Sequence, residues 1–188
     1  MAEVLLFHHA QGLTDGVRKF ADDLRAAGHT VHTPDLYEGK TFTDLNEGVA
    51  NARRVGFDML TERAKSAAET LPNELVYGGF SMGVGPAQML AQTRPGARGA
   101  LLFYGALPAS EFGPWPRGVP LQIHAMKDDP WFKEDSAAAD ELVAGVEGAE
   151  LFLYPGDRHL FADSSLPEYD EEAATLLIRR VLSFLEKT

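Results

Sequence analysis

Gly79-Phe80-Ser81-Met82-Gly83 is a short segment from which the rest of the architecture can be worked out. It matches the pattern G-x-S-x-G, which sets a serine on a sharp, strained turn between a strand and a helix. Its surroundings fit, because residues 74–80 form an apolar run typical of a strand and residues 82–92 carry a helical pattern. A glycine-rich turn with an incidental serine is the alternative, and the flanking strand and helix disfavour it. The sequence therefore predicts a nucleophilic serine at residue 81.

Short apolar runs alternate with helical patterns along the whole chain. The runs are almost continuously apolar, as expected of parallel strands that helices cover on both faces. They occupy residues 4–7, 29–33, 74–80, 99–104, 120–125 and 149–154. This alternation predicts one α/β domain over residues 1–188, with a mostly parallel central sheet of about six or seven strands.

The segments between the runs carry helix signals. Residues 17–27 have an apolar face and end at Gly28, and residues 134–146 form an acidic, alanine-rich candidate helix. Ser165-Leu166-Pro167-Glu168 resembles a capping box and predicts the start of the last helix. The pattern over residues 44–70 is weaker and predicts a helix in its later part.

The composition excludes several classes of protein. The chain has no cysteine, which excludes disulfides and thiolate chemistry. Its formal net charge of −11 disfavours nucleic acid, since phosphate binding needs basic patches. No segment approaches the ~20 apolar residues of a membrane span, and the first residues lack the basic region of a signal peptide. We therefore expect a cytoplasmic protein that binds neither nucleic acid nor membranes.

A serine hydroxyl becomes an effective nucleophile only when a base takes its proton. With this type of turn, the nucleophile is followed in the chain first by an acid and then by a histidine. Of the six histidines, only His159 comes late enough. It follows the sixth predicted strand, at the carboxyl edge of the sheet, where sites in open α/β sheets lie. Order and position thus favour a catalytic base over a solvated loop histidine.

The acid should follow a strand and precede His159. Asp128 and Asp129 both follow the fifth predicted strand, so either could orient the imidazole, and the other would be a loop or helix-capping residue. The oxyanion needs two backbone N–H groups, for which Met82 and Ala10 are the candidates.

Several segments of the sequence, taken together, resemble the dienelactone hydrolase family. The segments that carry the resemblance are His9-Ala10-Gln11-Gly12, Pro34-Asp35-Leu36-Tyr37, the G-x-S-x-G segment and Arg158-His159-Leu160-Phe161-Ala162. The resemblance implies a compact α/β-hydrolase with helices on both faces of the sheet and no large lid. It also implies Asp129 rather than Asp128 as the acid, because an alignment without a gap from His124 puts the family's aspartate there.

Three residues depart from the type member of that family. Ser81 replaces a cysteine nucleophile, His9 replaces a glutamate beside the nucleophile, and Asp163 follows the Phe-Ala pair where an arginine holds a substrate carboxylate. A carboxylate at position 163 would repel an acidic lactone. We therefore expect a neutral ester or lactone as the substrate.

The sequence thus predicts a hydrolase that cleaves a small carboxylic ester or lactone through Ser81, His159 and Asp129, without a metal or cofactor. The candidates for substrate-binding residues are His9, Tyr37, Trp131 and Phe161. The alternatives are a thioesterase and a non-catalytic ligand-binding protein of the same fold. The chain offers no basic cluster for coenzyme A or phosphate. A monomer and a homodimer are both compatible with the sequence.

Overall fold

Six parallel strands form one open sheet in the computed structural model, which describes residues 1–188. They pair in the order β2-β1-β3-β4-β5-β6, and every pairing is parallel. The strands are β1 (Glu3–Phe7), β2 (Thr30–His32), β3 (Val76–Phe80), β4 (Gly99–Phe103), β5 (Leu121–Met126) and β6 (Glu150–Tyr154). The predicted parallel sheet is therefore confirmed.

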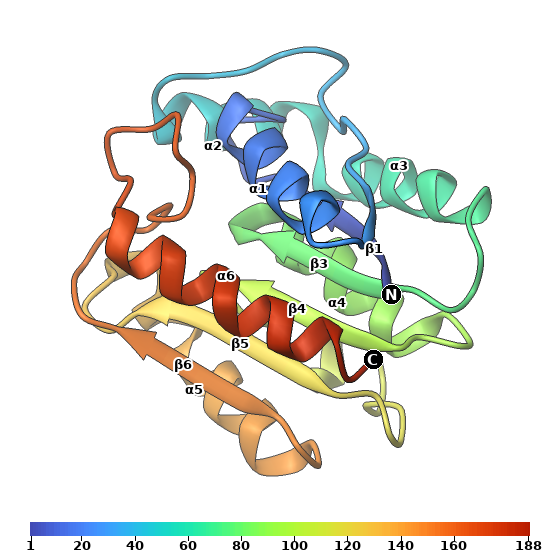
Figure 1. Cartoon of the computed structure of the whole chain (residues 1–188). Helices are drawn as coiled ribbons and strands as arrows, with labels where there is room; N and C mark the ends of the chain where they lie inside the picture. The colour runs from blue at the N-terminus through green and yellow to red at the C-terminus, as the bar shows by residue number, and fades with distance from the viewer.

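Six α-helices cover the two faces of this sheet, with α1 and α6 in front of the strands and α3, α4 and α5 behind them in Figure 1. They are α1 (Asp15–Ala26), α2 (Leu45–Val55), α3 (Phe57–Glu69), α4 (Val84–Thr93), α5 (Pro130–Gly145) and α6 (Glu171–Leu185). None of them combines the length and the apolar composition that a bilayer crossing requires. The compact α/β-hydrolase fold predicted from the sequence is confirmed.

The sheet separates two apolar cores, because successive residues of a strand point to opposite faces. In β1, Leu5 and Phe7 pack into the core shared with α3, α4 and α5, whereas Val4 and Leu6 pack into the core shared with α1 and α6. With both faces covered, polar side chains can meet a ligand only at the ends of the strands, and in such sheets they do so at the carboxyl ends.

The order of the strands reverses next to β1, since β2 lies on one side of it and β3 on the other. Ligands of open α/β sheets bind at such a switch point, where the loops after the two neighbouring strands diverge. Here the loop after β1 begins at His8, and the turn after β3 begins at Ser81. The topology therefore brings the serine turn and the loop with the predicted oxyanion donor to one place.

The predicted start of the last helix is wrong. Helix α6 begins at Glu171, where the side chain of Asp170 caps it by accepting from the N–H of Ala173 at 3.0 Å. Ser165 does not cap this helix, because its hydroxyl accepts from the N–H of Gly16 in the first turn of α1 and donates to the carboxylate of Asp163. These tertiary hydrogen bonds of Ser165 thus replace the local capping interaction that the sequence pattern predicts.

Two further helix boundaries differ from the sequence prediction. Helix α5 begins at Pro130, four residues before the predicted start, because Asp129 caps it by accepting from the N–H of Trp131 at 2.9 Å. Residues 45–69 form two helices rather than one, and they are separated at Gly56, whose φ of 93° interrupts the α-helical path.

Candidate active site

Ser81 stands directly after β3, as the first residue of a 3-10 turn, η1 (Ser81–Gly83), that leads into α4. Its φ of 49° lies in the left-handed region, which is costly for a residue with a side chain. Both glycines of the pattern are needed here. A methyl group on Gly79 would overlap the carbonyl oxygen of Gly83, and one on Gly83 would lie 2.6 Å from the carbonyl oxygen of Phe7. The turn is therefore strained and tightly packed against the end of β1.

Replacing Gly79 by alanine should lower the thermal stability, because the added methyl group has no space and the turn must move. Overpacking of this kind costs about 1–3 kcal/mol. Thermal unfolding followed by circular dichroism measures the effect. Gly145→Ala is the matched control, since a methyl group there meets no atom within 4 Å. Because Gly145 ends α5 and alanine is the better helix former, this variant should keep the midpoint or raise it slightly. Equal midpoints for the two variants would contradict the packing of the turn.

A chain of two hydrogen bonds joins Ser81, His159 and Asp129. The hydroxyl of Ser81 lies 2.8 Å from Nε2 of His159, and Nδ1 of His159 lies 2.7 Å from Oδ2 of Asp129. Asp129 is completely buried and His159 is 7% exposed, while Ser81 is partly accessible. The structure thus places three of the predicted residues in direct contact, although 78 residues separate Ser81 from His159 in the sequence.

The hydrogen-bond partners of His159 determine which of its ring nitrogens carries the proton. An ionised carboxylate can only accept, so Nδ1 of His159 carries the proton in its hydrogen bond with Asp129. Nε2 of the neutral ring is then free to accept from the hydroxyl of Ser81. This arrangement can draw the serine proton onto the imidazole and stabilise the resulting cation with the buried carboxylate.

The two candidate acids occupy different environments. Asp129 contacts His159, whereas Asp128 is exposed and its carboxylate lies 3.3 Å from Nζ of Lys133 at the surface. The second oxygen of Asp129 caps α5. The start of that helix therefore holds the carboxylate in place under the imidazole.

Two ring systems hold His159 from the sides. The rings of Tyr104 and Trp131 each lie 5.7 Å from the imidazole, measured between centroids. Tyr104 is buried, and its hydroxyl accepts from the N–H of Ala162 at 3.0 Å. It therefore anchors the loop that carries His159. Nothing in the local sequence indicates this role for Tyr104, because no local pattern marks a residue that supports a distant loop.

The predicted oxyanion donor in the loop after β1 belongs to a fixed peptide group. The carbonyl of His9 accepts from Nδ1 of His8 at 2.8 Å and from the N–H of Gly12 at 3.0 Å. All peptide bonds are trans, so the N–H of Ala10, in the same peptide unit, points the opposite way. No acceptor within the protein binds this N–H. The group is thus oriented and available.

A cavity of about 470 Å³ opens beside Ser81. Eight of its fifteen lining residues are hydrophobic, and they come mainly from α3, α4 and the segment around η2 (Ala109–Glu111). Its charged lining residues are Asp58, Glu111 and Asp135, with no lysine or arginine among them. Burial raises the pKa of Asp135. No group of three or more histidine or carboxylate side chains is arranged to hold a metal ion.

The four residues predicted to bind substrate do not line this cavity. Tyr37 is buried behind it, where its hydroxyl contacts Sδ of Met82 at 3.1 Å. Phe161 is fully buried in the core on the α1 and α6 side, and Trp131 stands outside, 41% exposed, against His159. His9 is 1% exposed and points to Asp163. The residues that do form the wall, such as Phe57 and Leu107, carry no motif that could have identified them.

The expectation that Asp163 faces the substrate is wrong. Its side chain is buried and accepts hydrogen bonds from His9, Thr14 and Ser165. Burial alone would raise the pKa of Asp163, but these hydrogen bonds hold the pKa below its usual value. Any electrostatic selection in the cavity must therefore come from Asp58, Glu111 and Asp135 instead.

Solved structures resemble the whole fold. A candidate dienelactone hydrolase from Klebsiella pneumoniae subsp. pneumoniae aligns with a TM-score of 0.78 and 20% identity, over 100% of this chain and 88% of its own. The dienelactone hydrolase-like promiscuous phosphotriesterase P91, from metagenomic libraries, aligns with a TM-score of 0.75 and 19% identity, over 100% and 86%. A dienelactone hydrolase from Anabaena variabilis gives 0.71 and 17%, over 100% and 86%. At these identities the likeness is one of fold.

Comparison of the sequence with curated proteins found no match. A family model, in contrast, covers the chain from end to end: residues 1–188 match the dienelactone hydrolase family. This match confirms the resemblance that the sequence motifs indicated, and it agrees with the fold. The chain belongs to the dienelactone hydrolase family, a family of hydrolases.

Proposed function

We propose that the protein hydrolyses small carboxylic esters or lactones by acyl transfer through Ser81. The observation that carries this proposal is the hydrogen-bond chain from Ser81 through His159 to Asp129, with the serine at the wall of a cavity. An isolated serine on a turn has no base. Here the hydroxyl has a base within proton-transfer distance, and the base has a buried carboxylate behind it.

In the first step, the hydroxyl oxygen of Ser81 attacks the substrate carbonyl while its proton passes to Nε2 of His159. Collapse of the tetrahedral intermediate breaks the bond to the leaving alcohol, which takes the proton from His159, and an acyl-serine remains. Water then attacks the acyl group with the same base, and the serine is restored. Asp129 stays ionised throughout and stabilises the imidazolium.

The charge that develops on the carbonyl oxygen needs donors that are in place before the reaction. We assign this role to the backbone N–H groups of Ala10 and Met82. Two features support the assignment. The N–H of Ala10 is oriented and has no acceptor within the protein, and η1 packs on the end of β1 so closely that Gly83 has no room for a side chain.

The cavity favours a neutral or positively charged substrate. Three carboxylates and no basic side chain line it, so a substrate carboxylate would be repelled at close range. Its mostly apolar wall suits a small aliphatic or aromatic acyl group. We therefore still propose a neutral substrate, but the residues responsible are Asp58, Glu111 and Asp135 rather than Asp163.

The charge of the acyl group should therefore decide the rate. We expect kcat/KM for 4-nitrophenyl butyrate to exceed that for 4-nitrophenyl hemisuccinate, whose acyl group ends in a carboxylate, by about tenfold or more. Two unit charges about 4 Å apart repel each other by about 1 kcal/mol in bulk water and by about 4 kcal/mol near a protein surface. The double variant Asp58→Asn/Glu111→Gln should accordingly lower the ratio of kcat/KM for the butyrate to kcat/KM for the hemisuccinate several-fold. Glu147→Gln changes a carboxylate outside the cavity and should leave this ratio unchanged. A wild-type preference for the hemisuccinate would refute this charge selection.

The proposed function itself is tested by rapid mixing with 4-nitrophenyl acetate. An acyl-serine mechanism predicts hydrolysis that is saturable in substrate and, where deacylation is slow, a burst of nitrophenol of about one equivalent per chain. A panel of neutral esters and lactones of increasing acyl size then defines the preferred substrate. No hydrolysis above the buffer rate for any member of the panel would contradict the proposal and favour a non-catalytic protein of this fold.

A further inference from the structure

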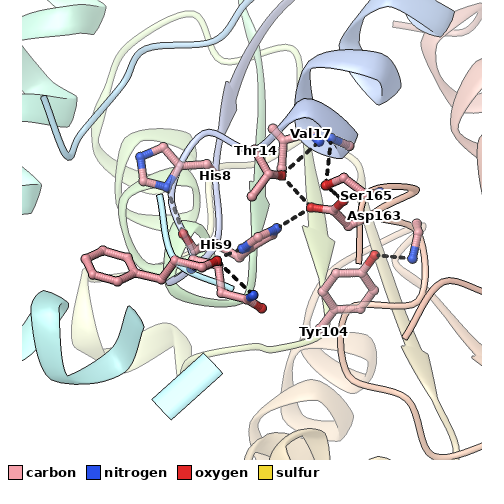
Figure 2. A network of polar contacts seen from close by, with 11 residues as sticks. His8, His9, Thr14, Val17, Tyr104, Asp163 and Ser165 are labelled. Atoms are coloured by element: carbon pink, nitrogen blue, oxygen red, sulfur yellow. Dashed lines mark hydrogen bonds and ion pairs between the residues drawn. The ribbon is translucent and has the colours of Figure 1, made fainter. Parts of the chain in front are cut away.

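A second buried imidazole–carboxylate pair lies outside the cavity. Nε2 of His9 is 2.8 Å from Oδ2 of Asp163, and the two residues are 1% and 4% exposed (Figure 2). A small crevice beside them is lined by residues such as Val17 and Phe20 of the core under α1 and α6. The cavity at Ser81 lies on the other side of the sheet, among residues of the core under α3, α4 and α5. The pair therefore does not line the cavity beside Ser81.

Asp163 is held by more partners than a surface carboxylate would have. Its Oδ2 accepts from His9 and from the hydroxyl of Thr14, and its Oδ1 accepts from the N–H and hydroxyl of Ser165 at 2.9 and 2.6 Å. Figure 2 shows these contacts converging on the one side chain. Each carboxylate oxygen of Asp163 thus accepts two hydrogen bonds. The carboxylate cannot rotate without breaking several of them.

His9 is fixed equally well. Because Asp163 only accepts, the proton of the neutral ring is on Nε2, and Nδ1 accepts from the N–H of Gln11 at 3.2 Å. The carbonyl of His9 accepts from the ring of His8, whose Nε2 in turn accepts from the N–H of Leu36 at 3.0 Å. Burial lowers the pKa of His8 to about 4, so that ring stays neutral and keeps this pattern at ordinary pH.

The two partners of the pair belong to the two loops that the reaction must align. His9 immediately precedes Ala10, the proposed oxyanion donor, and Asp163 follows His159, the proposed base, by four residues. The loops are 154 residues apart in the sequence at this contact. Two further hydrogen bonds join the same segments at the start of α1, from the hydroxyl of Thr14 to Asp163 and from the N–H of Gly16 to the hydroxyl of Ser165. The bond from His9 is the one that reaches the residue next to Ala10.

We propose that His9 and Asp163 form a loop clamp, a positioning device that keeps the N–H of Ala10 and the imidazole of His159 in register around the substrate carbonyl. This role rests on the proposed function. The clamp makes no contact with reacting atoms. It acts by fixing the peptide of Ala10 from the side chain of His9, while His8 fixes the carbonyl of the same peptide.

The kinetic test uses Asp163→Asn, His9→Gln and His9→Leu on a neutral nitrophenyl ester. Removing one oxyanion donor costs about 10²–10³ in kcat, and misplacing it should cost somewhat less. We expect kcat to fall about 10- to 100-fold with KM changed less than threefold. His9→Gln, which can still donate to Asp163, should keep more activity than His9→Leu. The affinity for a boronic acid inhibitor, which mimics the tetrahedral state, should fall by the same factor as kcat.

Leu177→Ala is the control for lost stability, since Leu177 is a buried residue of α6 in the same core. Assayed below its unfolding midpoint, it should be less stable than wild type and keep both kcat and the affinity for the boronic acid. A merely structural role for the pair would make the clamp variants behave like Leu177→Ala. Such a result, or a loss confined to KM, would overturn the proposal.

Hydrogen–deuterium exchange tests the coupling without any substrate. In Asp163→Asn, exchange should rise together in residues 8–14 and 155–165 and stay unchanged in β4 and α4. A rise in only one of the two loops, or in neither, would overturn the clamp. If the wild type hydrolyses no ester but Asp163→Asn raises exchange in both loops, the proposed function fails and the clamp still joins the two loops. If wild type is active and neither kcat nor exchange responds, the clamp alone fails.

Discussion

Ser81→Ala lowers kcat for 4-nitrophenyl acetate by about 10⁴-fold or more, if the hydroxyl of Ser81 is the nucleophile. The expected loss is large because the three side chains act as a unit, and a base without a nucleophile contributes little. KM should change little, since the hydroxyl is a small part of the cavity wall. The variant should fold at least as well as the wild type, because the alanine removes only one oxygen from a strained position.

A second serine supplies the control for this variant. Ser183 is an exposed residue of α6, on the opposite face of the sheet from the cavity, so Ser183→Ala should keep the full rate. Steady-state rates measured over a range of enzyme concentrations distinguish true residual activity from contaminating esterases. Activity of Ser81→Ala within tenfold of the wild type would rule out the acyl-serine mechanism.

Asp129→Asn should lower kcat by a similar factor, about 10⁴-fold. The amide can donate to Nδ1 of His159, which moves the ring proton to Nε2, and that nitrogen can then no longer accept from Ser81. Asparagine is also a good helix cap, so it can still accept from the N–H of Trp131 and preserve the start of α5. The loss should therefore appear in kcat without a comparable loss of thermal stability.

Asp128→Asn is a closely matched control, because it makes the same chemical change at the neighbouring residue. The side chain of Asp128 is exposed and pairs only with Lys133 at the surface, an interaction worth little. We expect a rate within twofold of the wild type. If Asp128→Asn were the more damaging of the two substitutions, the assignment of Asp129 as the acid would be wrong.

The part of the site that the sequence could predict is the part with local signals. Ser81 lies in a pattern that needs glycines at fixed spacing, and His159 is the one histidine in the right place in the chain order. Asp129 required the family resemblance, because Asp128 has the same side chain and the same relation to the strand. The structure explains the difference: one carboxylate caps α5 from inside, and the other faces solvent.

The cavity could not be predicted in the same way. Its wall combines residues from α3, α4 and the segment around η2, which meet only because the fold brings them together. None of the four predicted substrate-binding residues is part of it. His9 and Phe161 flank residues of the proposed site in the sequence, but their side chains point into the protein on the other side of the sheet. Proximity in sequence does not show which way a side chain points.

The same limit explains the error at the last helix. Ser165 and Glu168 have the spacing of a capping box, yet the carboxylate of Asp163 and the N–H of Gly16 bind the hydroxyl of Ser165 instead. Gly16 lies in α1, far away in the sequence, so this competition leaves no trace in the local pattern. The loop of residues 155–170 is thereby kept out of the helix and available to present His159 at the edge of the sheet.

Activation of the Ser81 hydroxyl by His159 is tested most directly by the rate of labelling with a fluorophosphonate, with the adduct located by mass spectrometry. The expected result is one adduct per chain on Ser81, none in Ser81→Ala, and labelling slower by about 100-fold or more in His159→Gln, since general-base assistance is worth about 10²–10⁴. No adduct on the wild type, or equal labelling rates for the wild type and His159→Gln, would contradict an activated serine at this site.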